Sequence, residues 1–317
     1  MFRKISTSKL IILFIILFGL VLILQWWDSH KGERSFNSQI VRIDSAAVST
    51  LIIYPKDKSA GEVKLFREGE TWKMSAKNKI YQADVNYIKS VLAELKKLKA
   101  ERIAATDKSK WKDYELNDTS CTHVIIKEGN SEVSDLFIGK FTFQQNNNPY
   151  QRGYGSVTSY IRIKNDDRVY ATEGMISMAF NRDVNMFRNK SLVSGKKENW
   201  NKLTFIYPAD SSFTVEKQNN KWTLNGSAVD STKLTNYLST LESVSGSDFM
   251  DNAPLGGATI YKLKIEGAGL IQPVEISAAV ADTLNRFVLS STANEAKFSC
   301  KNKFEQHIFV NKQTFLK

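Results

Sequence analysis

The chain carries DVNYIKSVLAELKKL at residues 84–98, and the pattern returns as DSTKLTNYLSTLESV at residues 230–244, an offset of 230 − 84 = 146 residues. Each segment opens with an aspartate, a favoured helix N-cap because its carboxylate accepts backbone N–H groups. Apolar residues then follow at spacings of three, one, three and three, which places them on one helical face. They are Ile88, Val91, Leu92, Leu95 and Leu98 in the first segment and Leu234, Tyr237, Leu238, Leu241 and Val244 in the second. We therefore predict two amphipathic helices, each lying on a sheet.

An internal repeat surrounds these helices. Before each helix, an aliphatic run ends in Tyr-Pro, as Leu51–Pro55 and again as Thr204–Pro208, and a second strand-like run leads to Trp72 or Trp222. After each helix come short alternating runs between turn residues, a pattern typical of antiparallel strands. These runs are 123–127, 133–138, 160–163 and 168–171 in the first half and 261–265, 274–277, 286–290 and 307–310 in the second. We predict an α+β fold of two tandem repeats, each an antiparallel β-meander with one covering amphipathic helix.

The repeat also predicts the domain boundaries. We expect the first repeat to cover residues 40–193 and the second to cover residues 200–317, each long enough for a core of its own. The polar, turn-rich residues 194–199, SGKKEN, are predicted to be the linker. Residues 29–39 are predicted to join the first repeat to an N-terminal segment, residues 1–28.

That N-terminal segment contains an almost unbroken apolar run from Leu10 to Trp27. At 1.5 Å per residue, a helix of this length reaches roughly 27 Å, near the thickness of a bilayer core. Arg3, Lys4 and Lys9 precede the run, which favours a cytoplasmic N-terminus. We predict a single transmembrane helix with the rest of the chain outside the cytoplasm. A cleaved signal peptide is the alternative, but residues 25–28, QWWD, lack the small residues that cleavage requires.

Composition excludes little. The net charge is +11, which could favour anionic lipid heads or acidic polymers. The lysines are scattered, however, which favours a solvated surface, and no nucleic-acid motif accompanies them. Cys121 and Cys300 lie far apart in strand-like runs. We predict two separate buried thiols, because free cysteine behaves as a small apolar residue. An oxidising compartment would permit a disulfide as the alternative.

The sequence shows no constellation of catalytic, cofactor-binding or metal-binding residues. The three histidines, His30, His123 and His307, have no second ligand at a spacing such as H-x-x-x-H. Gly153–Ser156 lacks the strand-to-helix context of a serine nucleophile. Asp166 and Asp167 sit between two predicted strands, where a hairpin turn accounts for them. We therefore expect no catalytic residue, no cofactor and no metal, and a protein that is not an enzyme.

One group of residues is a candidate interaction surface. Tyr150, Arg152, Tyr154 and Tyr160 lie close together in the sequence. Tyrosine and arginine are typical anchors of binding interfaces, although they also fill sheet faces. We carry these four residues forward as a hypothesis.

The order of several short motifs resembles the bacterial family known as domain of unknown function 4340. These motifs are Glu68–Trp72, Ala83-Asp84, Trp111–Leu116, Ile138-Gly139 and Phe187–Leu192. The resemblance covers residues 40–192 well and the second half more loosely. Where the family usually has glycine after the tyrosine of its Tyr-Leu turn, this chain has Glu115.

The resemblance implies a single-pass protein of the bacterial cytoplasmic membrane, encoded beside components of an ABC-type or gliding-associated transporter. On that basis we expect a membrane-anchored extracytoplasmic interaction module, an accessory subunit whose partners are transporter subunits and the membrane itself through Leu10 to Trp27. The alternative is an extracytoplasmic binding module for an envelope glycan or lipid, seated in a groove between the repeats.

Overall fold

The computed structural model describes residues 16–19, 21, 36–144, 156–251, 257–281, 287–300 and 304–316. No helix within these ranges is long and apolar enough to cross a membrane. The structure therefore does not show the transmembrane helix that we predicted. Of the segment from Leu10 to Trp27, only residues 16–19 and 21 are described, and they form no helix of that length.

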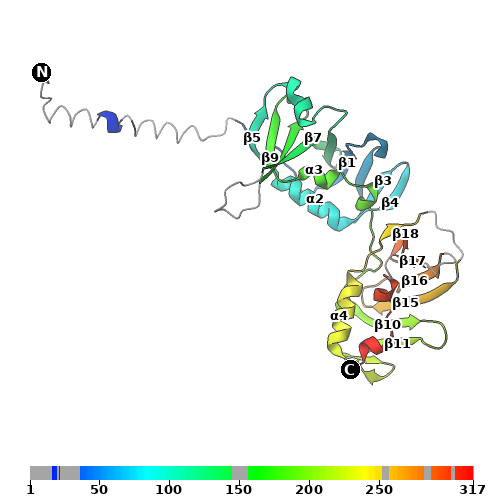
Figure 1. Ribbon diagram of the computed structural model, residues 1–317. Coiled ribbons are helices and arrows are strands. Elements are labelled where there is room, and N and C mark those ends of the chain that lie inside the picture. The colour runs from blue at the N-terminus through cyan, green and yellow to red at the C-terminus, as the bar shows by residue number, and fades with distance from the viewer. Residues whose placement is uncertain are drawn as a thin grey trace, which may run out of the picture. The chain divides into compact units, whose positions relative to one another are not determined.

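The first sheet has nine strands in the order β4-β3-β2-β1-β6-β7-β8-β9-β5 (Figure 1). Their bounds are β1 Val48–Tyr54, β2 Val63–Glu68, β3 Thr71–Ala76, β4 Lys79–Gln82, β5 Ala100–Ala105, β6 Thr122–Glu128, β7 Ser131–Gln144, β8 Ser156–Ile163 and β9 Val169–Glu173. Neighbouring strands are joined mainly by short turns, which forces them to run antiparallel. There are two exceptions: β1 pairs with β6, with four strands between them in the chain, and β5 crosses to the far edge and pairs with β9.

The second sheet repeats this topology, in the order β13-β12-β11-β10-β15-β16-β17-β18-β14. Its strands are β10 Trp200–Ile206, β11 Phe213–Gln218, β12 Lys221–Leu224, β13 Ser227–Ala228, β14 Asp248–Phe249, β15 Thr259–Gly267, β16 Val274–Val280, β17 Phe287–Ser291 and β18 Asn294–Ser299. Each strand of one sheet therefore has a counterpart in the other, which allows a position-by-position comparison of the two sheets.

Helices account for fewer residues than strands. They are α2 Val85–Lys97, α3 Ile176–Phe180, α4 Ser231–Glu242 and α5 Glu305–Ile308, with 3-10 turns η1 Lys58–Ala60, η2 Lys108–Tyr114, η3 Val184–Phe187, η4 Lys197–Asn199 and η5 Lys312–Phe315. Asp84 caps α2, because its Oδ1 accepts the N–H groups of Asn86 and Tyr87, each at 3.0 Å. Asp230 caps α4 in the same way.

The α+β assignment, with one covering helix for each meander, is wrong. The described residues are mostly β, in two nine-stranded antiparallel sheets. In the second half, α4 shares the core with the C-terminal turns: the Tyr237 hydroxyl donates to Ile308 O at 2.7 Å, and its ring lies 5.2 Å from the ring of Phe315. The run 307–310, predicted as a strand, instead contains the end of α5. Short turns that each insert one side chain have no periodicity for a sequence pattern to reveal.

The alignment of the two Tyr-Pro motifs by sequence differs by one residue from the alignment of the two strands by structure. Ile53 and Phe205 are both fully buried, and they pair with the buried residues Val124 and Leu263 of the next strand. The structural counterpart of Tyr54 is therefore Ile206, whereas the sequence match aligns Tyr54 with Tyr207. Alternation decides the correspondence, since a shift of one residue moves a side chain to the other face of the sheet.

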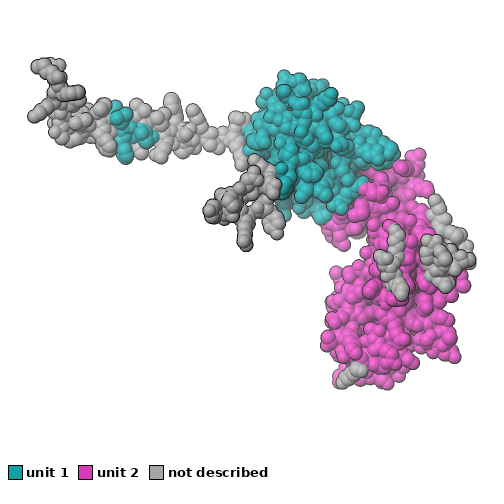
Figure 2. Space-filling model, viewed as in Figure 1, with its two compact units in different colours: residues 1–62, 90–182 teal, residues 63–89, 183–317 magenta. Residues whose placement is uncertain are grey.

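The chain divides into two compact units, residues 1–62 with 90–182 and residues 63–89 with 183–317 (Figure 2). One core cluster of the first unit is made by Leu116, Tyr160, Val169 and Ala171. The core of the second unit is rich in aromatic residues and includes Trp200, Phe205, Phe298 and Phe315.

Gly139 explains why Ile-Gly stands in the middle of β7. A Cβ at this position would lie 2.1 Å from the backbone oxygen of Tyr114 and 3.0 Å from Cγ of Leu116. The absence of a side chain lets the end of η2 close onto β7, next to the irregularity in the β7–β8 pairing between Ile138 and Phe141. Glycine in a strand interior commonly marks such a close backbone approach.

We expect Gly139→Ala to lower the free energy of unfolding by about 2 kcal/mol, because a backbone carbonyl cannot move aside as a flexible side chain can. Urea unfolding measures the loss. Ser134→Ala, in the same strand, is the matched control and should cost less than about 0.5 kcal/mol. Equal stability of the two variants would contradict the close contact.

Candidate functional site

A row of stacked side chains crosses the outer face of the first sheet. The strand registers place Tyr54 opposite His123, His123 opposite Phe137, and Phe137 opposite Arg162. Ring centroids lie 5.4 Å apart for Tyr54 and His123 and 4.2 Å apart for His123 and Phe137, the latter pair within 2° of parallel. The Arg162 guanidinium carbon lies 3.4 Å from the Phe137 ring centre and 3.9 Å from that of Trp111 in η2. We call these five residues the outer stack.

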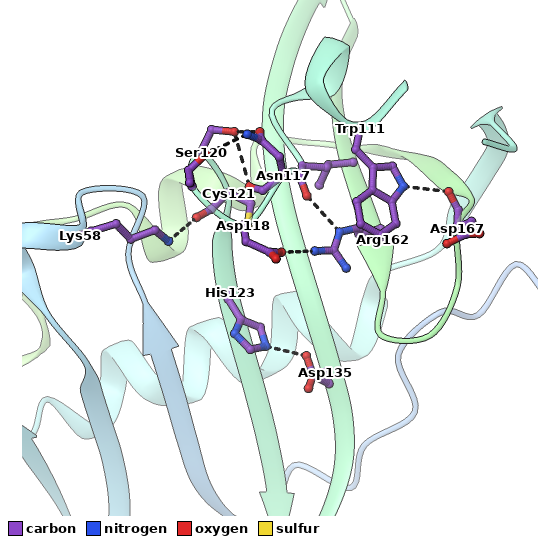
Figure 3. A network of polar contacts seen from close by, with 12 residues as sticks. Lys58, Trp111, Asn117, Asp118, Ser120, Cys121, His123, Asp135, Arg162 and Asp167 are labelled. Atoms are coloured by element: carbon purple, nitrogen blue, oxygen red, sulfur yellow. Dashed lines mark hydrogen bonds and ion pairs between the residues drawn. The ribbon is translucent and has the colours of Figure 1, made fainter. Parts of the chain in front are cut away.

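Hydrogen bonds fix the polar members of the outer stack (Figure 3). His123 Nε2 lies 2.6 Å from the buried Asp135 Oδ1, and Lys164 Nζ lies 2.9 Å from the second Asp135 oxygen. Arg162 donates from Nε to Leu116 O at 2.9 Å and from Nη2 to Asp118 at 2.7 Å.

These partners give the network a structural role. Both oxygens of Asp135 are engaged, by His123 and Lys164, and both faces of the Phe137 ring are covered, by His123 and Arg162. Burial raises the pKa of the Cys121 thiol, which keeps it protonated and unreactive at neutral pH. Within the described ranges, no three His, Cys, Asp or Glu side chains gather closely enough to hold a metal ion.

The second sheet shows that the fold does not require the outer stack. In its equivalent registers, Ile206 lies opposite Lys262, Lys262 opposite Ser277, and Ser277 opposite Ser290. This second row is an ordinary solvated surface, with an ion pair of 3.2 Å between Lys262 and Glu275. The first sheet has therefore added a rigid clamp across strands β1, β6, β7 and β8.

Beyond this clamp, an apolar surface is open to solvent. The side chains of Phe141 and Phe143 in β7 are 43% and 63% exposed, and those of Met175 and Met178 at α3 are 46% and 48% exposed. Phe141 and Met178 line a cavity of about 300 Å³ together with Ser177, Asn181 and Arg182. Val157 of β8 pairs with Phe143 on one side and accepts the N–H of Gly174 at 2.8 Å on the other, so β8 separates Phe143 from the residue that precedes Met175. We call Phe141, Phe143, Met175 and Met178 the β7–α3 surface.

The repeat again supplies a comparison. Phe180 of α3 and Ile308 of α5 are both fully buried, and each stands seven residues before a buried phenylalanine, Phe187 or Phe315. This alignment makes Gln306 the counterpart of Met178. The counterpart of β7 in the second sheet is β16. Strand β16 ends at Val280, whereas β7 continues to Gln144 and therefore includes Phe143. The exposed methionine and phenylalanine are additions of the first copy.

Of the residues proposed from sequence as an interaction surface, the structure describes one. Tyr150, Arg152 and Tyr154 lie outside the described residues. Tyr160 is described, in β8, and is only 8% exposed; its ring centroid lies 4.6 Å from that of Tyr114. Sequence reasoning missed the β7–α3 surface because the predicted strand stopped at residue 138. The alternation Phe141-Thr142-Phe143 was the available signal for a longer strand.

Asp166 stabilises the turn between β8 and β9, which contains the Asp166-Asp167 pair. Its carboxylate accepts hydrogen bonds from the Arg168 side chain, with Nε at 2.9 Å and Nη2 at 2.8 Å, and from the Tyr170 hydroxyl at 2.6 Å. The Arg168 hydrogen bonds lower the pKa of Asp166 to about 2. All of its partners are local, so the turn closes on itself.

The comparison with protein families gives one match, over residues 72–259, to the family described as Domain of unknown function (DUF4340). The chain belongs to this family. Neither the curated proteins nor the solved structures include a match to this chain. The region matched to DUF4340 includes the β7–α3 surface and the segment Phe187–Leu192.

Glu115 stands where the resemblance to DUF4340 implies a glycine. The residue has φ 56° and ψ 39°, a left-handed conformation that favours glycine, and it ends η2. Its N–H donates to Lys112 O at 3.2 Å, and its carboxylate pairs with Lys56 at 2.7 Å. The turn thus keeps a glycine-like conformation without glycine.

We expect Glu115→Gly to be more stable than Glu115→Ala by about 1 kcal/mol, because both lose the exposed ion pair but only glycine relieves the left-handed strain. Urea unfolding of the two variants measures the difference. A more stable alanine variant would contradict the assigned backbone conformation.

The Asp166 turn predicts a pH dependence. Because the folded-state pKa lies below the ordinary value of 3.8, the carboxylate contributes stability above pH 3.8, and this contribution is lost as the pH falls towards about 2. Asp166→Asn should therefore destabilise the protein at pH 7 by about 1 kcal/mol and have progressively less effect below pH 4. Thermal unfolding of the wild type and of Asp166→Asn across this range measures the difference, and an effect that does not change with pH would contradict the role of the carboxylate.

Proposed function

We propose that this protein is an interaction module that docks a protein partner through the β7–α3 surface, as an accessory subunit of an ABC-type or gliding-associated transport assembly. The observation that carries the docking role is the exposure of four large apolar side chains in β7 and at α3, two of which, Phe141 and Met178, line one cavity. Exposed apolar patches of this kind are typical of interaction sites, and methionine adapts its shape to a partner. The transport assembly rests on the family resemblance alone.

The surface also has the support that a docking site needs. Phe141 and Phe143 extend from β7, and β7 is held against its neighbours by the outer stack through Phe137. A rigid platform lowers the conformational entropy lost when a partner binds. The outer stack is thus assigned the role of holding the docking strand in place.

The lining of the cavity indicates the partner's chemistry. Its walls are the apolar side chains of Phe141 and Met178, and Arg182 is the charged residue among the five that line it. An apolar segment that carries an acidic side chain would bury Met178 and pair with Arg182.

We test this with a photo-crosslinking amino acid placed at position 178 or at position 306 of the full chain in cells. Position 306 is the structural counterpart of 178 in the second half, so it is a matched control. We expect mass spectrometry to find a transport subunit crosslinked from position 178 and not from position 306.

Met178→Gln combined with Phe143→Ser should reduce partner capture at least about tenfold, with little change in the unfolding temperature because both side chains are exposed. The control is Ile206→Thr, which changes an exposed apolar residue elsewhere. Equal crosslinking from both positions, capture that is insensitive to the double variant, or no captured transport subunit would each overturn the proposal.

A further inference from the structure

A second specialised feature lies in the unit formed by residues 63–89 and 183–317, around Arg188. This residue is buried, with only 4% of its surface exposed. Its guanidinium carbon lies 3.9 Å from the ring centre of Tyr81 and 3.6 Å from that of Phe249, so aromatic faces replace water on both sides. A flat cation held between two rings is fixed in orientation and presents only its edge.

The hydrogen bonds of Arg188 leave that edge partly unused. Nη1 and Nη2 donate to the two oxygens of Asp251 at 2.8 Å and 2.7 Å, and Nη1 also donates to Asn185 Oδ1 at 3.0 Å. Nε is buried and finds no hydrogen-bond partner within the described residues. A buried donor without a partner is costly, and such groups are rare in folded proteins.

Asp251 is a less firmly held partner than Arg188. Its side chain is 36% exposed, whereas that of Arg188 is 5% exposed. The hydrogen bonds to Arg188 lower the pKa of Asp251, so it is charged at neutral pH. The cation is therefore built into the unit, while its carboxylate reaches it from the solvent side.

The fold itself does not need an arginine here. Arg188 directly follows η3, and Leu316 directly follows the equivalent turn η5. The preceding phenylalanines have matching roles, because Phe187 O accepts the N–H of Asp84 at 2.8 Å and Phe315 O accepts that of Asp230 at 2.9 Å. The second copy thus fills the position of the arginine with an apolar residue.

A cavity of about 220 Å³ adjoins the ion pair. Its lining consists of Ile80, Tyr81, Gln82, Arg188, Asn189, Phe249, Asp251, Asn294, Glu295 and Ala296. Ile80 is 65% exposed and gives the cavity an apolar wall at the edge strand β4. Glu295 would repel an anion, so a bound anion should direct its charge towards Arg188.

We propose that this cavity binds a small ligand with a carboxylate beside an apolar side chain, and that the ligand carboxylate exchanges with Asp251 on Arg188. One carboxylate replaces another, so the ion pair itself changes little. The gain comes from a ligand oxygen that reaches Nε and from apolar contact with Ile80. The same chemistry is present in a free branched carboxylic acid and in the C-terminal residue of a peptide.

The test uses the full chain and four probes: 4-methylpentanoate, N-acetylleucine and the uncharged amide of each. The readouts are the dissociation constant from calorimetry and the NMR signal of the Arg188 Nε–H group. We expect the acids to bind and shift this signal and the amides to have no effect. Tighter binding of N-acetylleucine would indicate a peptide C-terminus, and equal binding of both acids would indicate a free acid.

Asp251→Ala should tighten acid binding by about tenfold or more, because it removes the internal competitor. Arg188→Leu, which copies Leu316, should abolish binding, and Asp113→Ala is the distant charge control. If Arg188→Leu does not fold, the proposal is still tested by the NMR signal of Arg188 Nε–H in the wild type and by the acid affinity of Asp251→Ala. The proposal is overturned if acids and amides behave alike in both the wild type and Asp251→Ala, or if Asp251→Ala leaves acid affinity unchanged.

Discussion

Each sheet depends on a long-range register at its centre, between β1 and β6 in the first sheet and between β10 and β15 in the second. In the first sheet, Ile53 lies opposite Val124, and in the second, Phe205 lies opposite Leu263. All four side chains are fully buried. Because side chains alternate with a period of two, a slip of one residue would exchange the inner and outer rows. In the first sheet such a slip would turn the His123 row into the core, where its charged and polar members would lose their partners.

A comparison of the two sheets shows which residues this register does not determine. Inner rows are apolar in both, whereas outer rows differ in kind: a stack that ends in Arg162 and Trp111 in one sheet, and lysine, glutamate and serine in the other. The same contrast recurs at Met178 against Gln306 and at Arg188 against Leu316. The comparison of the two copies thus separates residues that the shared topology demands from residues that are particular to one copy. Both candidate sites consist largely of the second kind.

Local features were predictable from sequence, and non-local ones were not. The caps at Asp84 and Asp230 follow from side-chain chemistry within three residues, and the apolar faces of α2 and α4 from a simple period. The outer stack joins Tyr54, Trp111, His123, Phe137 and Arg162, which only the strand registers bring together. We predicted an α+β fold where the described residues are mostly β, because long amphipathic helices give strong sequence patterns and short strands give weak ones. The displacement of the Tyr-Pro motif by one residue shows that sequence identity can mislead where burial does not.

The place of β5 at the far edge of the first sheet has a kinetic consequence. Strands β6 to β9 form successive hairpins, whose contacts close short loops and form early. By contrast, Ala100 of β5 pairs with Thr172 of β9, across some seventy residues, a separation similar to that of Ile53 and Val124 in the β1–β6 pair. Docking of β5, like the pairing of β1 with β6, is therefore a late step in assembling this sheet. Until it occurs, β9 presents an open strand edge on which a nascent chain could be captured by a chaperone or by another copy of itself.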